Sequence, residues 1–123
     1  MASVLVVEDE KLVRRTLNKM LRAGGHDVTE VEDGQRALSY LERHPADVVV
    51  TDIVMPGKDG LETIAELRRR FPNAKIIAIS GGAHSSRAGA LKAAKALGAD
   101  RILAKPFRQD AILAMVDELM RSA

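Results

Sequence analysis

Short runs of apolar and β-branched residues recur along the chain, and stretches with apolar residues three or four positions apart alternate with them. The runs are Val4–Val7, Asp27–Val31, Val48–Val50, Ile76–Ile79 and Ile102–Ala104. The first, third and fourth runs are continuous, which is typical of strands covered on both faces of a parallel sheet, whereas the second alternates and is expected at an edge. The alternation predicts a doubly wound α/β fold, in which right-handed crossovers place five parallel strands between two layers of helices.

Five helices are expected, one after each strand. Their apolar residues share one face: Leu17, Met20 and Leu21 in the first, Leu61, Ile64 and Leu67 in the third, and Ile112, Met115, Val116 and Leu119 in the last. Turn and capping residues agree with this periodicity. Gly24-Gly25 closes the first helix, Asp33-Gly34 opens the second, and Gly98 stops the fourth.

Length and composition narrow the class of protein. The chain has 123 residues, so residues 1–123 are expected to form a single domain with one hydrophobic core. It contains no cysteine, which excludes disulfides and thiolate metal sites. No apolar run approaches the roughly 20 residues that cross a bilayer, and no signal peptide is visible, so we expect a cytoplasmic protein without membrane contact.

The charge pattern argues against binding to nucleic acid. The net charge is only +2, and basic residues are interspersed with acidic ones rather than gathered into a stripe. The densest basic cluster, Arg68-Arg69-Arg70, lies at the predicted end of a helix, where cations complement the helix dipole. We therefore expect no nucleic-acid partner for this domain.

Polar residues stand at the end of four of the five predicted strands. They are Glu8-Asp9, Thr51-Asp52, Ser80-Gly81-Gly82 and Lys105-Pro106. Since the carboxyl ends of parallel strands meet at one edge of the sheet, these side chains are expected to lie together, at the place where such sheets bind ligands. Three carboxylates at close range repel one another, and unless some are protonated they need a cation between them; oxygen ligands favour Mg²⁺ where a phosphate also binds. Lys105 and Ser80 would then serve the phosphoryl oxygens.

The same residues resemble those of a known family. Glu8-Asp9, Asp52 followed by Met55-Pro56-Gly57, Ser80-Gly81 and Lys105-Pro106-Phe107 are similar to the motifs of the response-regulator receiver domains of two-component signalling. The resemblance runs from Ser3 to about Met120. It implies a flavodoxin-like receiver fold with the strand order 2-1-3-4-5.

The resemblance also implies how the site works. Asp52 would accept a phosphoryl group from the phosphohistidine of a sensor histidine kinase or a histidine phosphotransfer protein. Mg²⁺ would be held by Asp9, Asp52 and the backbone carbonyl of Val54, with Glu8 reaching the ion directly or through water. The protein would then be a regulatory phosphoacceptor rather than an enzyme, with Mg²⁺-dependent self-phosphorylation and slow autodephosphorylation only.

Further residues would pass on the signal. Lys105 would pair with the phosphoryl group, aimed by a cis peptide bond to Pro106. Ser80, followed by Gly81, would turn toward the phosphoryl oxygens and relay the change to a docking face of the fourth helix, fifth strand and fifth helix. The family usually has an aromatic residue where this chain has Ile102, and that residue rotates with the serine or threonine as part of the switch. The sequence leaves open whether the branched aliphatic Ile102 takes part in the switch. The loop at Gly81–Ser86 also looks longer than usual, and we expect it to be mobile.

Several functions fit a sequence of this kind. The first is a stand-alone receiver or phosphorelay intermediate, and the alternative is a receiver fragment of a longer regulator with a DNA-binding or enzymatic output domain. A phosphatase with Asp52 as its nucleophile is disfavoured, because Val54 stands where such enzymes commonly place a general acid. A nucleotide-binding domain is disfavoured because Glu8-Asp9-Glu10 stands where phosphate needs glycines and free amides.

Overall fold

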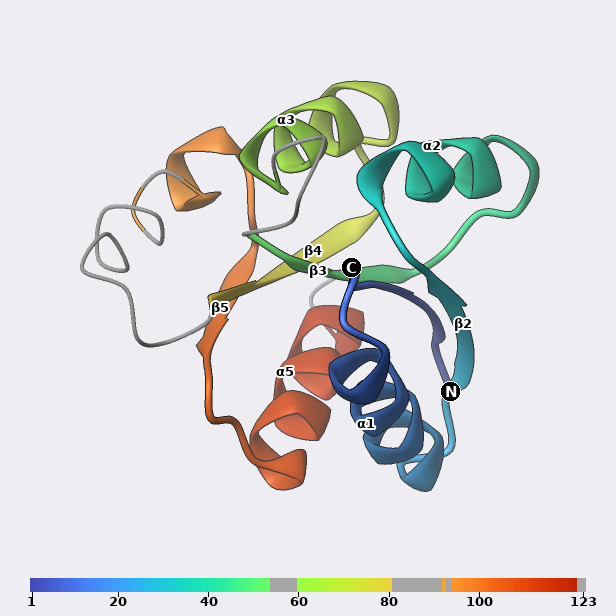
Figure 1. Cartoon of the computed structure of the whole chain (residues 1–123), viewed down its shortest axis with the longest axis vertical. Helices are drawn as coiled ribbons and strands as arrows, with labels where there is room; N and C mark the ends of the chain where they lie inside the picture. Colours follow the sequence, from blue (N-terminus) through green and yellow to red (C-terminus); the bar gives the residue numbers. More distant parts are fainter. Residues whose placement is uncertain (54–59, 81–91, 93, 122–123) are drawn as a thin grey trace.

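A five-stranded parallel sheet forms the centre of the protein, in the order β2-β1-β3-β4-β5 (Figure 1). The computed structural model describes residues 1–53, 60–80, 92 and 94–121. The strands are β1 (Ser3–Val7), β2 (Asp27–Val31), β3 (Val48–Asp52), β4 (Lys75–Ser80) and β5 (Arg101–Ala104). The predicted fold class and strand order are confirmed, and the alternating run Asp27–Val31 is an edge strand as expected.

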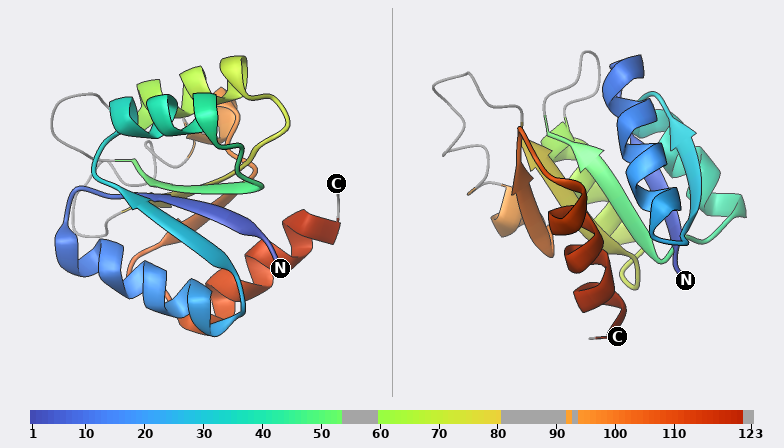
Figure 2. Two further views of the ribbon diagram at one scale, coloured as in Figure 1. Left: turned by 90° about the vertical axis from the view of Figure 1, so that its right-hand side faces the viewer. Right: turned by 90° about the horizontal axis from the view of Figure 1, so that it is seen from below.

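Helices cover both faces of this sheet. They are α1 (Lys11–Ala23), α2 (Gly34–Arg43), α3 (Gly60–Arg70) and α5 (Gln109–Arg121). Residues 92 and 94–97 are also helical, and the start of this fourth helix lies outside the described residues. The helices α1 and α5 lie side by side on one face, while α2 and α3 cover the other (Figures 1 and 2). This arrangement follows from right-handed crossovers between parallel strands.

The core consists of two apolar layers, one on each face of the sheet. Along β1, Leu5 and Val7 face the layer under α2 and α3, whereas Val4 and Val6 face the layer under α1 and α5. All four are at most 1% exposed. Because both faces of the strand are buried, every position must be apolar, and this is why the run is continuous. Burial of this kind contributes roughly 25 cal/mol per Å² of apolar surface.

The strand β3 ends in polar residues, as the sequence pattern predicts. Thr51 and Asp52 are the last residues of β3, and both are buried. Asp52 is opposite Ile79 of β4, and Val7 at the end of β1 is opposite Thr51. The ends of β1, β3 and β4 are therefore fixed against one another by the sheet, and this carries Asp52 to the same edge as the residues that follow Val7.

The opposite edge of the sheet is anchored by Arg68 in the last turn of α3. Its guanidinium donates hydrogen bonds to the carbonyl oxygens of Gly98 and Ala74 and to the carboxylate of Asp100. Asp100 also accepts a hydrogen bond from the backbone N–H of Ile76. The predicted end of the fourth helix at Gly98 is confirmed, and this end is tied to α3 and β4.

Replacing Gly98 by alanine should destabilise the protein. Gly98 has φ +121°, and a Cβ atom there would lie 2.8 Å from Cγ of Arg68, which its hydrogen bonds hold in place. We expect Gly98→Ala to lower the free energy of unfolding by about 2 kcal/mol in a urea titration. Gly25→Ala is the control, since Gly25 has φ +87° with no atom within 4 Å and should cost only about 1 kcal/mol. Equal losses in the two variants would contradict the steric contact with Arg68.

Candidate functional site

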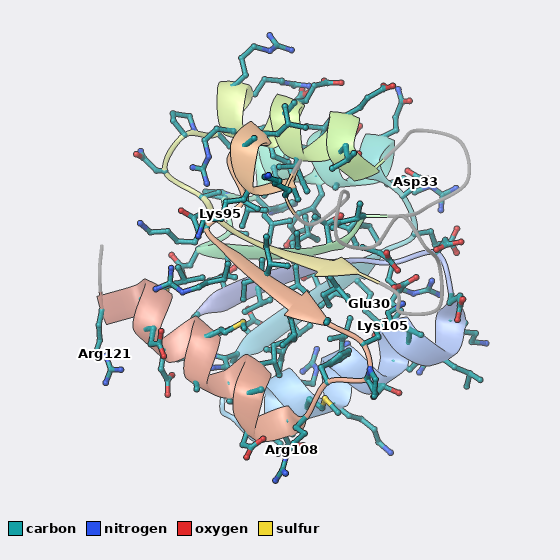
Figure 3. All side chains as sticks on the ribbon, turned by 90° about the vertical axis from the view of Figure 1, so that its left-hand side faces the viewer. Glu30, Asp33, Lys95, Lys105, Arg108 and Arg121 are labelled. Carbon is teal, nitrogen blue, oxygen red and sulfur yellow. The ribbon has the colours of Figure 1, made fainter. Side chains whose placement is uncertain are left out.

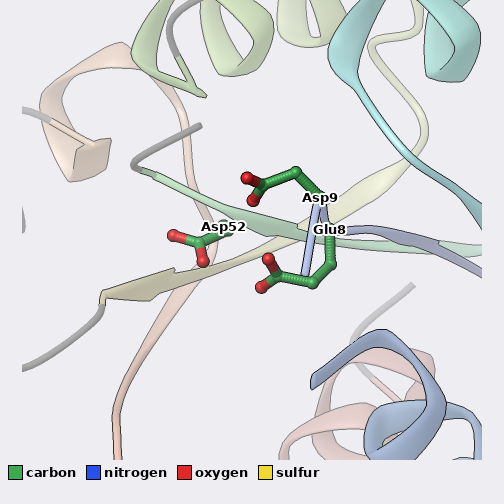
Figure 4. A group of neighbouring side chains, drawn as sticks. All are labelled: Glu8, Asp9 and Asp52. Carbon is green, nitrogen blue, oxygen red and sulfur yellow. The ribbon is translucent and has the colours of Figure 1, made fainter. Parts of the chain in front are cut away.

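Three carboxylates meet at the carboxyl edge of the sheet (Figure 4). Glu8 and Asp9 follow the end of β1, and Asp52 closes the neighbouring strand β3. One carboxylate oxygen from each residue lies within 4.8 Å of the other two. The structure thus brings together the three acidic residues that the sequence pattern selects. In the part of the chain that is described, no other group of three or more His, Asp or Glu side chains is close enough to share a metal ion.

Glu8 has an unfavourable environment for a negative charge. It is 1% exposed, and its Oε2 accepts a hydrogen bond from the backbone N–H of Glu10 at 3.0 Å. Its Oε1 is buried and has no hydrogen-bond partner among the described residues. Burial raises the pKa of Glu8 to about 8, and a hydrogen bond to Asp52 and the charge of Asp52 add to this. At neutral pH the metal-free protein therefore holds Glu8 mainly in its protonated form.

Lys105 follows the end of β5 (Figure 3), and its ammonium faces the carboxylates of Asp52 and Glu8. Its Nζ lies 3.0 Å from Oδ2 of Asp52 and 3.6 Å from Oε1 of Glu8. Burial alone would lower the pKa of Lys105, but the hydrogen bond to Asp52 and the charges of Asp52 and Glu8 raise it above the usual value. The amine stays protonated. The peptide bond between Lys105 and Pro106 is cis, as the resemblance implies.

The donor set suits a hard divalent cation. Three carboxylate oxygens converge, one from the exposed Asp9 and two from the buried Glu8 and Asp52, and the Lys105 ammonium faces the buried pair. The buried Oε1 of Glu8, which has no hydrogen-bond partner among the described residues, is the kind of acceptor that a cation or its bound water satisfies. The described residues of this site contain no sulfur or imidazole ligand, so Mg²⁺ fits better than a softer metal.

The structure describes the other predicted site residues only in part. Ser80 is the last residue of β4, opposite Ala104, but its side chain is not described. Val54, Gly81 and the loop at residues 81–86 lie outside the described residues. Ile102 is half-buried within β5, opposite Ala78. The parts of the site that the structure fixes are therefore the acidic group and the lysine.

Sequence reasoning passed over one residue that contacts the acidic turn. Arg14, in the first turns of α1, donates a hydrogen bond to the backbone carbonyl of Glu8 at 2.9 Å and forms an ion pair with Glu30 at 3.2 Å. The available signal was an arginine on the half-buried side of an amphipathic helix. Helix α1 begins after Glu10, which is its N-cap residue, so Asp9 is not the N-cap of this helix.

A model of the response regulator receiver domain family matches residues 4–117 of the chain. The chain belongs to this family. The receiver domain is 34% identical over 115 residues to the response regulator protein FleR of Pseudomonas aeruginosa. This match covers 94% of this chain and 24% of FleR. It is 35% identical over 119 residues to the response regulator MprA of Mycobacterium sp. strain KMS. This match covers 96% of this chain and 50% of MprA. The receiver domain thus spans only a quarter to a half of these curated relatives.

Solved structures agree with this assignment. The receiver domain of NtrX from Brucella abortus superposes with a TM-score of 0.90 at 26% identity, covering 98% of this chain and 99% of that one. The receiver domain of the Francisella response regulator 1452 gives a TM-score of 0.87 at 28% identity and covers 100% of both chains. The described residues of this receiver domain include no helix that is long and apolar enough to span a membrane.

The buried Glu8 predicts how the stability of the metal-free receiver domain depends on pH. Its pKa is about 8 in the folded state against 4.5 as a free group, so between these values the folded state binds more protons than the unfolded state. The free energy of unfolding should therefore fall as the pH rises from about 4.5 to 8.

Glu8→Gln should remove this fall in the free energy of unfolding with rising pH. In EDTA at pH 8 the variant should melt higher than the wild type by the equivalent of at least about 1 kcal/mol, roughly 3–5 °C. Asp117→Asn, which changes an exposed carboxylate on α5, should follow the wild type. Identical pH profiles for Glu8→Gln and wild type would show that Glu8 is already ionised at neutral pH.

Proposed function

We propose that this receiver domain accepts a phosphoryl group on Asp52 from the phosphohistidine of a sensor histidine kinase or histidine phosphotransfer protein. The observation that supports this most is the position of Asp52. It ends a buried strand at the edge of the sheet, 3.0 Å from the ammonium of Lys105 and beside Glu8 and Asp9. A buried carboxylate with an adjacent cation and metal ligands is what phosphoryl transfer to an aspartate requires.

The chemistry is a displacement at phosphorus. An oxygen of Asp52 attacks the phosphorus in line with the P–N bond to the donor histidine. The P–N bond breaks, and its electron pair leaves with the imidazole of the donor. Lys105 exchanges its contact with the Asp52 carboxylate for one with a phosphoryl oxygen, and so stabilises the charge there. Asp9, Asp52 and the carbonyl of Val54 would hold Mg²⁺, with Glu8 reaching it directly or through water, and the bound ion would neutralise charge on the phosphoryl oxygens.

The domain is regulatory, and its own reactions are limited. We propose that it phosphorylates itself from small phosphodonors in the presence of Mg²⁺ and loses the group slowly by autodephosphorylation. Asp52 is 5% exposed, so water reaches the acyl phosphate only with difficulty. No substrate beyond the phosphodonor is needed.

The signal would leave the domain through protein docking. Ser80, with Gly81, would turn toward the phosphoryl group and shift the face formed by the fourth helix, β5 and α5, where Lys92 and Lys95 are exposed. Ile102 lies on β5 within this face, in place of the usual aromatic residue. We place this docking in the cytoplasm, without a membrane partner.

Nucleic acid is not a proposed partner of this domain. Within the basic cluster of α3, Arg68 pairs with Asp100, and Arg70 pairs with Glu42 and Glu66. These arginines already have acidic partners within the domain, and no basic stripe remains in the described surface of α3.

We propose that residues 1–123 act as one receiver unit, and the curated relatives favour a second reading of its context. Because the chain spans about a quarter of FleR and half of MprA, it also fits the receiver portion of a longer regulator with a DNA-binding or enzymatic output domain. The length of the native reading frame distinguishes this from a stand-alone phosphorelay intermediate.

Intact mass measurement tests the proposed function. Incubation with Mg²⁺ and acetyl phosphate should add one phosphoryl group to the wild type and none to Asp52→Asn. Asp117→Asn, an exposed and distant carboxylate, should be modified like the wild type. An unmodified wild type, or a modified Asp52→Asn, would contradict Asp52 as the phosphoacceptor.

A further inference from the structure

Arg14 contacts the backbone of the acidic turn from α1. Its Nη1 donates to the carbonyl oxygen of Glu8 at 2.9 Å and lies 3.5 Å from that of Asp9. Its Nε pairs with Oε1 of Glu30 on the edge strand β2 at 3.2 Å. The Arg14 side chain is only 11% exposed and that of Glu30 only 22%, so this is a largely buried ion pair. Arg14 therefore joins three elements: the turn after β1, helix α1 and strand β2.

The two carbonyl groups need such a partner. The residues Glu8 and Asp9 precede α1, whose N-cap is Glu10, so neither carbonyl accepts an intrahelical hydrogen bond. The turn is held on its other side by the hydrogen bond from the Glu10 N–H to the Glu8 carboxylate. Together with that bond and the hydrogen bond from the Glu8 N–H to the Val31 carbonyl, the Arg14 contact restrains the backbone that carries two of the three acidic side chains.

The position of Arg14 is itself fixed. Glu30 accepts a second hydrogen bond, from the side-chain amide of Asn18 one turn further along α1. Asn18 in turn accepts a hydrogen bond from Arg22, which also donates to the carbonyl of Val28 on β2. This chain of polar contacts runs along the seam between α1 and β2, and a guanidinium anchored in this way holds its fork in one orientation.

We infer that Arg14 is a positioning residue for the Mg²⁺ site. It orders the backbone of Glu8 and Asp9 so that their carboxylates meet that of Asp52. This rests on the proposed function, since it assumes that the acidic group binds the ion. The charge of Arg14 acts in the opposite sense, because a guanidinium beside the acidic turn repels a divalent cation. Loss of the backbone contact should therefore weaken Mg²⁺ binding, whereas loss of the positive charge alone should strengthen it.

Thermal melts over a range of Mg²⁺ concentrations separate these effects, because an ion that binds the folded state raises the melting temperature according to its affinity. Arg14→Met keeps an unbranched apolar stem but removes the hydrogen bonds and the charge, and it should weaken Mg²⁺ binding by about tenfold. Arg14→Lys keeps the charge but cannot span Glu8 and Glu30 with a planar fork, and it should also weaken binding. Unchanged or tighter Mg²⁺ binding in both variants would overturn the inference.

Arg15→Met is the matched control. It removes the same charge from the same helix at an exposed position that takes no part in the contacts between α1 and β2 described above. It should leave the Mg²⁺ affinity unchanged, whereas weakening equal to that in Arg14→Met would assign the effect to helix α1 in general and overturn the role of Arg14. If Arg14→Met does not fold, Arg14→Lys decides.

The wild type separates this inference from the proposed function. A wild type that binds no Mg²⁺ and accepts no phosphoryl group would refute both. A wild type that binds and reacts, with Arg14 variants of the same affinity, would refute the role of Arg14 alone.

Discussion

Repulsion between carboxylates at the end of a buried parallel sheet is the constraint on which the site depends. Glu8 and Asp52 are nearly inaccessible to water, and Asp9 lies beside them, with carboxylate oxygens within 4.8 Å of one another. One lysine faces Glu8 and Asp52. The metal-free protein responds by retaining a proton on Glu8, whose pKa is about 8. Under the proposed function, a bound divalent cation would offset the charge of the carboxylates and then that of a phosphoryl group on Asp52, so the electrostatic cost of the resting site and its proposed chemistry would have one origin.

The fold holds these charges together because the strands that carry them have no freedom to part. The apolar faces of β1 and β3 are buried on both sides, and their register fixes Val7 opposite Thr51. Slipping a strand to separate the carboxylates would expose apolar side chains along its whole length. The hydrophobic layers thus offset an electrostatic cost that is confined to one edge. The opposite edge, tied together by Arg68 and Asp100, contributes stability without taking part in the chemistry.

The strands, the sheet edge and the acidic group could be predicted from the sequence because each leaves a local pattern: continuous apolar runs, and polar residues where those runs stop. The position of Asp52 at the end of β3 was predicted and is confirmed. Its direct ion pair with the Lys105 ammonium, which helps to offset the cost of burying the carboxylate, was not predicted, because it joins residues that follow different strands. Arg14 was missed for a similar reason. Its partners Glu8 and Glu30 lie on other elements, and no spacing along the chain records a contact that exists only after folding.

The central claim is that Glu8, Asp9 and Asp52 together bind a divalent cation, and locating the ion in a crystal tests it most directly. Mn²⁺ substitutes for Mg²⁺ at oxygen sites and scatters anomalously. Crystals grown with Mn²⁺ should give an anomalous difference peak within bonding distance of carboxylate oxygens of Asp9 and Asp52, with Glu8 at the ion or at one of its waters. An empty map at this edge of the sheet at saturating Mn²⁺, or a peak elsewhere with none between these residues, would contradict the account.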